Sequence, residues 1–238
     1  MELILHMKYT NMVPGIFLKR PNRFIAHVMV HGREEIAHVK NTGRCRELLL
    51  PGSRIILQDH GFNTSRKTRY SLISVYKEDM LVNMDSQVPN RVVIDALGNG
   101  DIQGLGAPGL IKGEQKFGDS RFDVYYRDGD REGFIEVKGV TLEMDGLSKF
   151  PDAPTIRGTK HIMEMIKAVE DGYDGNIFFL LQMKGPRGFT PNREMDPAFG
   201  EALDLAASRG VGIHVYDSIV TFDSIQIGSK IQYREQVL

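Results

Sequence analysis

The hydrophobic pattern of the chain changes its period near residue 85, and this change constrains the fold more than any other feature. Before it, short runs of β-branched, aromatic and other apolar residues alternate with turn residues, as in closely spaced strands. After it, segments with helical spacing alternate with strands. A chain of 238 residues is long enough for two domains. We therefore predict a fold of the α/β (α+β) class with two domains, residues 1–85 and 86–238.

Residues 1–85 contain six candidate strands and one short helical piece. The strands are expected at 16–20, 24–30, 35–40, 54–57, 70–76 and 81–83, and the helical piece at 47–50. Several short strands around one helical piece are typical of a small closed β-barrel, and the OB-fold is the leading candidate of this size.

Basic residues are interleaved with aromatic residues in this predicted barrel. One face of an OB-fold commonly binds single-stranded nucleic acid through such residues. The densest basic cluster lies in a predicted loop at 65–69. We therefore regard Arg44, Arg66, Lys67 and Arg69 as candidate phosphate contacts. The alternative, in which these side chains only solvate the surface and the phenylalanines fill the barrel, remains open.

Residues 86–238 predict a mixed sheet flanked by helices. The expected order is a helix (87–97), three strands (110–117, 121–127 and 133–140), a helix (155–171), a strand (176–183), a helix (197–209) and a strand (211–217). The strand at 176–183 is nearly all apolar, which is typical of a strand that is covered on both faces.

The hairpin formed by the second and third of these strands carries the clearest chemical pattern. Because side chains alternate along a strand, Glu136 and Lys138 share one face, and a simple register across the turn at 128–130 brings Asp123 to it. Two carboxylates can bind Mg²⁺ or Mn²⁺, and a neighbouring lysine can hold a nucleophile or a phosphate. Asp123, Glu136 and Lys138 are therefore candidate catalytic residues. The alternative is that these residues are ordinary surface charges on an exposed strand.

A second group of polar residues lies on the predicted helix 155–171. Arg157, Lys160 and His161 follow helical spacing near the amino end, where free N–H groups favour anions. We regard all three as candidate nucleic-acid contacts, and expect a bound anion or Asp152 nearby. An ordinary solvated helix face is the alternative.

Composition limits these interpretations. The net charge is -1 and the pI is near 6.7, so any nucleic-acid surface must be a local patch. A single cysteine, Cys45, excludes an internal disulfide framework and a cysteine-rich zinc site. The sequence has neither a leader pattern nor an apolar run of membrane-spanning length. We therefore expect a cytoplasmic protein with no membrane association.

Several motifs, taken in order, resemble the sugar fermentation stimulation protein family (SfsA). They are Asn41-Thr42-Gly43-Arg44, Gln87-Val88-Pro89-Asn90, Gly118-Asp119-Ser120-Arg121-Phe122-Asp123, Glu136-Val137-Lys138-Gly139 and Arg157-Gly158-Thr159-Lys160-His161. The resemblance implies an amino-terminal OB-like domain and a carboxy-terminal domain of the PD-(D/E)XK nuclease type. It also implies binding of DNA with little sequence preference and an association with the regulation of sugar, particularly maltose, utilisation.

The resemblance matches Asp123, Glu136 and Lys138 to the trio of that nuclease superfamily. It also makes Glu114, or Asp95, an additional metal ligand, because many relatives place an acid upstream. We expect a DNA-binding protein. The first alternative is a nuclease that uses Mg²⁺ or Mn²⁺, and the second is an interaction module that does not bind nucleic acid. The preference for single- or double-stranded DNA and the oligomeric state are open as well.

Overall fold

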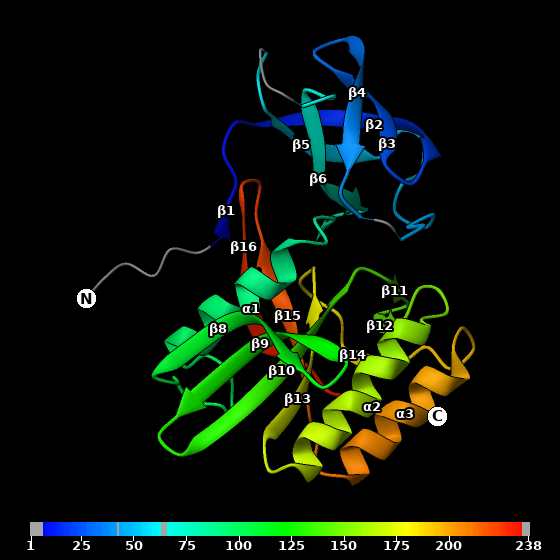
Figure 1. The fold of residues 1–238 in the computed structure, drawn as a ribbon. Helices are drawn as coiled ribbons and strands as arrows, with labels where there is room; N and C mark the ends of the chain where they lie inside the picture. The colour runs from blue at the N-terminus through cyan, green and yellow to red at the C-terminus, as the bar shows by residue number, and fades with distance from the viewer. Residues whose placement is uncertain (1–6, 42, 63–65, 235–238) are drawn as a thin grey trace.

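A computed structural model describes residues 7–41, 43–62 and 66–234. It contains a closed β-barrel followed by a curled seven-stranded sheet, with three helices in the described part of the chain (Figure 1). The predicted mixed fold, with a small OB-like barrel before a mixed sheet, is confirmed. No helix among the described residues is long and apolar enough to cross a membrane.

The barrel is built from the first large sheet. Its strands are β2 (Met12–Asn22), β3 (Ile25–Val30), β4 (Arg33–Val39), β5 (Arg54–Asp59), β6 (Tyr70–Lys77) and β7 (Met80–Asn83), in the order β4-β3-β2-β5-β6-β7. A parallel pairing of β4 with β6, from Ala37↔Tyr70 to Val39↔Leu72, closes it. Val28, Leu57 and Leu72 are fully buried inside. Closure removes the open sheet edges that this region would otherwise expose.

Two parts of the barrel differ from the prediction. Residues 46–48 form a turn, and residues 49–50 have no regular structure, instead of the expected helical piece at 47–50. Strand β2 starts at Met12, four residues earlier than expected, although Pro14 and Gly15 suggest a turn. Gly15 suits this strand because a Cβ there would lie 2.9 Å from Leu57 Cδ1 and 3.0 Å from the backbone oxygen of Met29, so a larger residue would crowd its neighbours.

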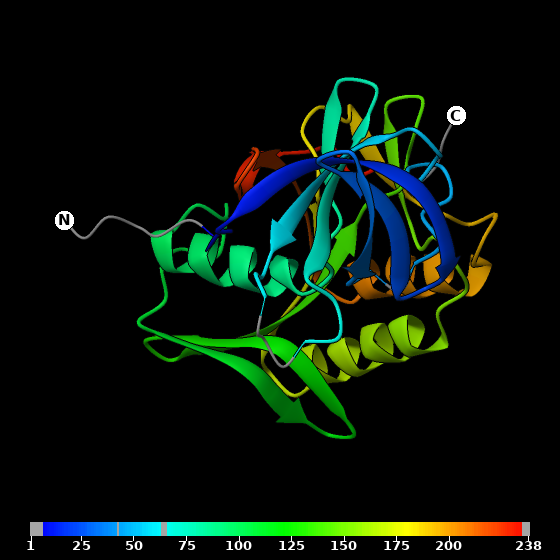
Figure 2. The ribbon, with the colours of Figure 1, turned by 90° about the horizontal axis from the view of Figure 1, so that it is seen from above.

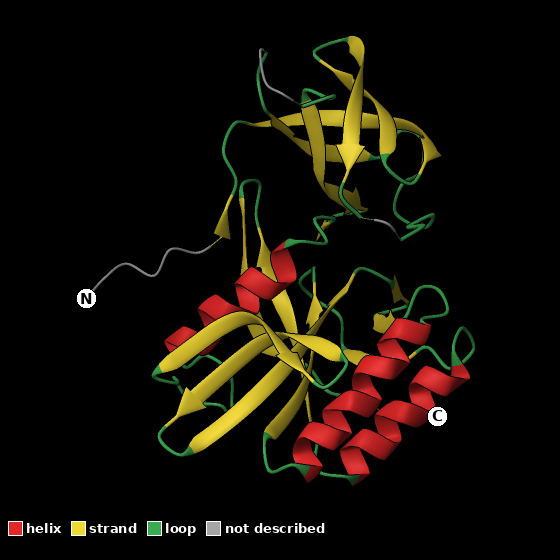
Figure 3. Ribbon diagram, viewed as in Figure 1, coloured by secondary structure: helices red, strands yellow, loops and turns green. Residues whose placement is uncertain are grey.

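The second sheet has the order β1-β16-β15-β13-β10-β9-β8. Figure 3 shows its strands in yellow beside the red helices. Its elements are β1 (Met7–Lys8), β8 (Leu110–Phe117), β9 (Ser120–Asp128), β10 (Arg131–Val140), β13 (Asp174–Leu181), β15 (Gly212–Val220) and β16 (Ser224–Lys230), with helices α1 (Val88–Asn99), α2 (Ile156–Glu170) and α3 (Pro197–Ser208). Strands β10, β13 and β15 are parallel, and the others pair antiparallel. A small third sheet contains β11 (Glu143–Met144), β12 (Leu147–Phe150) and β14 (Gly188–Pro191).

Helices cover both faces of the second sheet (Figure 2). On one face Val92 and Leu97 of α1 belong to the same buried cluster as Phe178 and Leu180 of β13. On the other face, α2 and α3 enclose a cluster around Phe179. Alternate residues of β13 therefore face two different cores, which explains its nearly continuous apolar sequence.

A buried polar network joins the two domains. Lys40, at the end of β4, donates to Asp85 Oδ2 at 2.6 Å, and Tyr9 donates to the same atom at 3.4 Å. Gln182, which follows β13, donates to the backbone oxygens of Asn83 and Asp85. Strand β1 pairs with β16, so the described chain contributes an edge strand to the second sheet before it enters the barrel.

Candidate metal and nucleic-acid site

Asp123 lies where strands β9 and β10 separate. Their backbone register ends at Ile135↔Val124, and the N–H of Val137 then donates to Asp123 Oδ2 at 2.8 Å. Asn90, in the first turn of α1, donates to Asp123 Oδ1 at 2.8 Å. The Asp123 carboxylate therefore accepts an N–H that a backbone oxygen of β9 would otherwise accept. Contacts from both β10 and α1 fix its position.

Glu136 lies beside Asp123 in the middle of the sheet, and its side chain is 3% exposed. Its Oε1 accepts hydrogen bonds from Lys138 Nζ and from His161 Nδ1, each at 2.5 Å. Its Oε2 is buried without a hydrogen-bond partner among the described residues. The structure therefore brings Asp123, Glu136 and Lys138 together, and it leaves one carboxylate oxygen available.

The pKa values of the two carboxyl groups shift in opposite directions. Burial, together with the nearby charge of Glu136, raises the pKa of Asp123. Burial also opposes the ionisation of Glu136, but the hydrogen bonds from His161 and Lys138 outweigh it and lower the pKa of Glu136. Ionising both groups therefore places two negative charges close together, a situation that a divalent cation relieves.

His161 has a different environment from the solvated helix face that the sequence left open. It is 7% exposed, and its Nδ1 faces Glu136 while its Nε2 accepts from Arg157 Nε at 3.4 Å. These contacts assign the neutral tautomer with the proton on Nδ1. Glu164, on the same helix, is buried as well. His161 therefore orients Glu136 instead of facing solvent.

The amino end of α2 keeps two exposed cations, Arg157 and Lys160. Thr155 caps the helix by accepting the N–H of Gly158 at 3.0 Å. Asp196 is a carboxylate at this end, where its Oδ2 accepts the N–H of Thr155 at 2.8 Å. The expected anion or Asp152 beside Arg157 and Lys160 stays a prediction.

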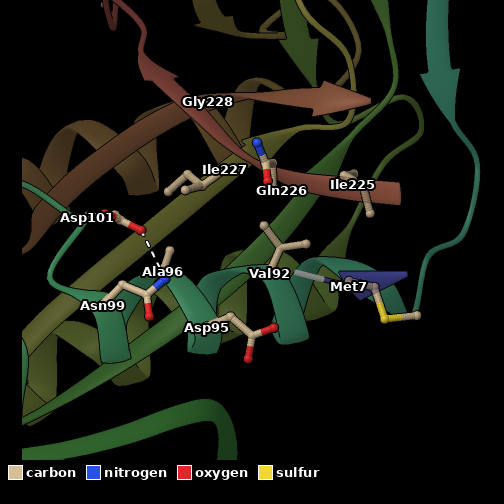
Figure 4. Close-up of a pocket in the computed structure, with 10 residues that line it drawn as sticks. All are labelled: Met7, Val92, Asp95, Ala96, Asn99, Asp101, Ile225, Gln226, Ile227 and Gly228. Atoms are coloured by element: carbon tan, nitrogen blue, oxygen red, sulfur yellow. Dashed lines mark hydrogen bonds between the residues drawn. The ribbon is translucent and has the colours of Figure 1, made fainter. Parts of the chain in front are cut away.

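The two upstream acids lie outside this cluster. Glu114 has a side chain that is 72% exposed and accepts from Arg121 at 3.2 Å. Asp95 pairs with Arg91 at 2.9 Å and lines a separate cavity of about 320 Å³ between α1 and β16, in which Asn99 and Asp101 are hydrogen-bonded (Figure 4). No group of three or more His, Cys, Asp or Glu within the described ranges could hold a metal ion. The acidic part of the site therefore consists of Asp123 and Glu136.

The predicted basic contacts of the barrel have different environments. Arg69 donates to both oxygens of Asp59, at 2.7 and 2.5 Å, and lies over the Phe62 ring at 4.0 Å. Arg66 donates to Ser71 Oγ at 3.1 Å. Lys67 and Arg44 are exposed, whereas Ser65 of the same predicted loop lies outside the described residues. Arg69 is therefore already neutralised by a protein carboxylate.

Asn90 is the site residue that the sequence analysis did not select. Its only signal is its place in the motif at 87–90, just inside the start of a helix. An asparagine there is ordinary, because the first turn of a helix often carries polar residues. Its contact with Asp123, thirty-three positions along the chain, depends on the tertiary fold.

Comparison with known proteins identifies related sequences along most of the chain. A family model described as the SfsA N-terminal OB domain matches residues 18–84, and one described as the sugar fermentation stimulation protein RE domain matches residues 87–224. The sugar fermentation stimulation protein homolog of Alkaliphilus oremlandii is 52% identical over 229 residues, which cover 94% of this chain and 97% of that protein. The homolog of Desulfitobacterium hafniense is 54% identical over 222 residues, 93% and 96% of the two chains.

A solved structure is similar as well. The SfsA of Pyrococcus furiosus, described in complex with Ca²⁺, superposes with a TM-score of 0.86 at 27% identity. The match covers 97% of this chain and 99% of that one. Both the barrel and the curled sheet therefore have counterparts in one solved chain.

Proposed function

Because the chain belongs to the sugar fermentation stimulation protein (SfsA) family, we propose that it binds DNA and hydrolyses phosphodiester bonds at Asp123, Glu136 and Lys138 with a divalent cation. The observation that carries this proposal is the buried Oε2 of Glu136, which has no partner among the described residues. Buried polar atoms are normally hydrogen-bonded, so an unpartnered carboxylate oxygen beside a second carboxylate suits a cation ligand. The Ca²⁺ complex of the Pyrococcus furiosus relative supports the same interpretation.

Two carboxylates fit Mg²⁺ or Mn²⁺, because Mg²⁺ commonly uses one or two carboxylates and completes its shell with water and substrate phosphate. Glu136 Oε2 and one oxygen of Asp123 would hold the cation. When bound, it would supply positive charge for the phosphate and favour deprotonation of a water.

The remaining residues have separate tasks in this proposal. Lys138 Nζ uses one hydrogen bond on Glu136, and its other two N–H donors can hold a phosphate oxygen or the attacking water. His161 fixes the orientation of Glu136. Asn90 and the backbone N–H of Val137 fix Asp123. Such supporting contacts normally affect metal affinity and activity strongly.

Contacts to phosphates account for DNA binding with little sequence preference, because phosphate carries no sequence information. The exposed predicted contacts are Arg44, Arg66, Lys67, Arg157 and Lys160. A cytoplasmic location would follow from a DNA substrate. A second candidate function is regulation of sugar (maltose) utilisation through DNA binding without cleavage; the family's description supports only its link to sugar fermentation.

The test is to titrate the purified chain with Mg²⁺ or Mn²⁺ in the presence of labelled single- and double-stranded DNA. Binding and cleavage are measured together, with Glu136→Gln beside the wild type. Asp128→Asn, an exposed change at the far end of the same hairpin, is the matched control. We expect cleavage that requires the metal, persists in the control and disappears in Glu136→Gln.

Two other results would contradict the proposal. Binding without cleavage under any of these conditions would leave a protein that holds DNA without cutting it. If the chain shows no salt-sensitive binding to DNA, the result would instead favour an interaction module without a nucleic-acid partner.

A further inference from the structure

A basic groove lies on the barrel where it faces the second domain. The hollow has a volume of about 660 Å³ and is lined by residues of β2, of the β2–β3 turn, of the loop at 43–51 and, from the second domain, by Ala153. Its cations are Lys19, Arg23, Arg44 and Arg46, together with Arg20, and its lining contains no acidic residue. We call this hollow the barrel groove.

Four of these cations are available to a ligand. Within the described residues, Lys19, Arg23, Arg44 and Arg46 make no side-chain hydrogen bond or ion pair, whereas Arg69 is bound to Asp59. Unpaired cations gathered in one hollow attract anions more strongly than cations that a protein carboxylate already neutralises. The barrel groove is therefore better suited to phosphate than the predicted loop at 65–69.

Arg20 fixes the backbone segments that form the groove. Its guanidinium donates to the backbone oxygens of Asn41, Gly43 and Arg44 at 2.6, 2.8 and 2.9 Å, and to that of Arg23 at 2.7 Å. One side chain thus fixes the β2–β3 turn against the loop that carries Arg44. Fixed backbone positions reduce the entropy that the free cations lose when they bind a ligand.

An exposed aromatic ring beside the groove favours a single strand. Phe17 and Leu49 line the groove but are buried in the barrel core, whereas Phe24, next to Arg23 in the same turn, is 51% exposed. Single strands expose base faces that pack on such a ring, while their phosphates follow a basic groove. The bases of a duplex are paired and stacked, so their faces are not free to pack on Phe24.

A second, smaller hollow adjoins this groove on the side of the second domain. Gly43 lines both the barrel groove and a polar hollow of about 160 Å³ that also includes Lys149 and Gly139. A Cβ on Gly43 would lie 2.5 Å from Asp152 Oδ2, so a larger residue would crowd this junction. The two hollows therefore meet at Gly43.

From these observations, and resting on the proposed function, we infer that the barrel groove binds a single strand of DNA. The groove would thereby select single-stranded DNA over duplex. Phosphates would contact the free cations, and a base would pack on the Phe24 ring.

The test compares two double variants, each of which replaces two positive charges by two negative ones. Lys19→Glu with Arg46→Glu changes the groove, and Arg33→Glu with Lys116→Glu changes exposed cations elsewhere on the two domains. Fluorescence anisotropy in EDTA measures binding of a short labelled oligo-dT, of its duplex and of oligo-U over a salt series. Thermal unfolding establishes that both double variants fold.

We expect the wild type to bind oligo-dT more tightly than duplex. The groove variant should lose at least about tenfold in oligo-dT affinity at low salt, and its salt slope should fall by about 1.4, because each single-strand phosphate contact contributes about 0.7. The control variant should stay within about twofold of the wild type. Equal losses in both variants, preference for duplex, or binding of oligo-U alone would overturn the inference.

The design separates this inference from the proposed function. Binding is measured without metal, so a chain that binds oligo-dT through the groove but never cleaves would contradict only the nuclease. Metal-dependent cleavage by the wild type, with unchanged oligo-dT affinity in the groove variant, would contradict only the groove.

Discussion

His161 Nδ1 donates a hydrogen bond of 2.5 Å to Glu136 Oε1, which joins helix α2 to the centre of strand β10. Lys138 donates to the same oxygen, so both donors occupy one side of the carboxylate. The other carboxylate oxygen, Oε2, has no hydrogen-bond partner in the described chain. Helix α2 therefore sets the orientation of the carboxylate that we propose as a metal ligand.

His161→Ala should lower DNA cleavage by about 10- to 100-fold and raise the metal concentration needed for half-maximal activity, because Glu136 loses its orienting donor. His161→Gln, which keeps an N–H donor, should restore part of the loss. The measurement is cleavage rate against Mg²⁺ or Mn²⁺ concentration. Lys160→Ala, at the neighbouring exposed position, should weaken DNA binding and leave the metal titration unchanged; the same titration shift in both variants would contradict the positioning role.

Asp123→Ala should destabilise the protein by about 1–3 kcal/mol, because it leaves the N–H of Val137 without its acceptor. Asp123→Asn keeps an oxygen for that N–H and should cost less, since the Asn90 amide can turn to present its own oxygen. Both variants should lose metal-dependent cleavage. Urea unfolding monitored by circular dichroism gives the free energies of unfolding, and equal losses for the two variants would exclude this structural role.

Asp85→Ala should lower the free energy of unfolding by about 3 kcal/mol, because it leaves Lys40 without its carboxylate at the junction of the two domains. The side chains of Lys40 and Asp85 are only 18% and 3% exposed. Glu170→Ala breaks the exposed pair with Arg209 and serves as the control, with an expected loss below about 1 kcal/mol. Similar losses in urea unfolding would mean that the buried pair contributes no more than a surface pair.

The stability of the protein should fall in mild acid because of His214. Burial, and to a smaller extent the charge of Lys230, lower the pKa of His214 to about 4. In the unfolded chain its pKa is near the ordinary value of about 6.5, so between these values the unfolded state binds more protons and the free energy of unfolding falls as the pH falls. The full effect is about 3 kcal/mol.

Urea unfolding at about pH 7 and about pH 5 tests this expectation. His214→Gln, which can still donate to Asn176, should lose less stability than the wild type over that interval. The control is His31→Asn at an exposed turn position with a φ of 49°, a conformation that asparagine tolerates. It should retain the wild-type pH dependence, and an unchanged dependence in His214→Gln would exclude His214 as the cause.

Much of the fold could be predicted from local sequence. The hairpin of β9 and β10 follows from alternating side chains and an Asp-Gly turn, and β13 from its apolar run. Strand β16 was missed because only Ile225 and Ile227 mark it, between polar residues and Gly228. Its existence depends on pairing with β15, and such pairing has no local signal.

The candidate site, too, could be predicted from local sequence only in part. Glu136 and Lys138 are two positions apart on one strand, so their proximity follows from the geometry of a strand. The contact of Glu136 with His161 spans 25 positions and depends on how α2 is rotated against the sheet. Packing of Ile162 and Met165 within the core sets that rotation. The chemical roles of these residues, including nucleic-acid contact, stay predictions.

The pairing of β1 with β16 has a consequence for how the chain is made. The ribosome synthesises Met7 218 residues before its partner Ile225. All strands of the barrel, from Met12 to Asn83, are complete long before that. We expect the barrel to form first on the nascent chain, since domains commonly fold as units during synthesis. The edge of the second sheet would close last, so that an arrested or truncated chain would expose the backbone of β15 to other polypeptides.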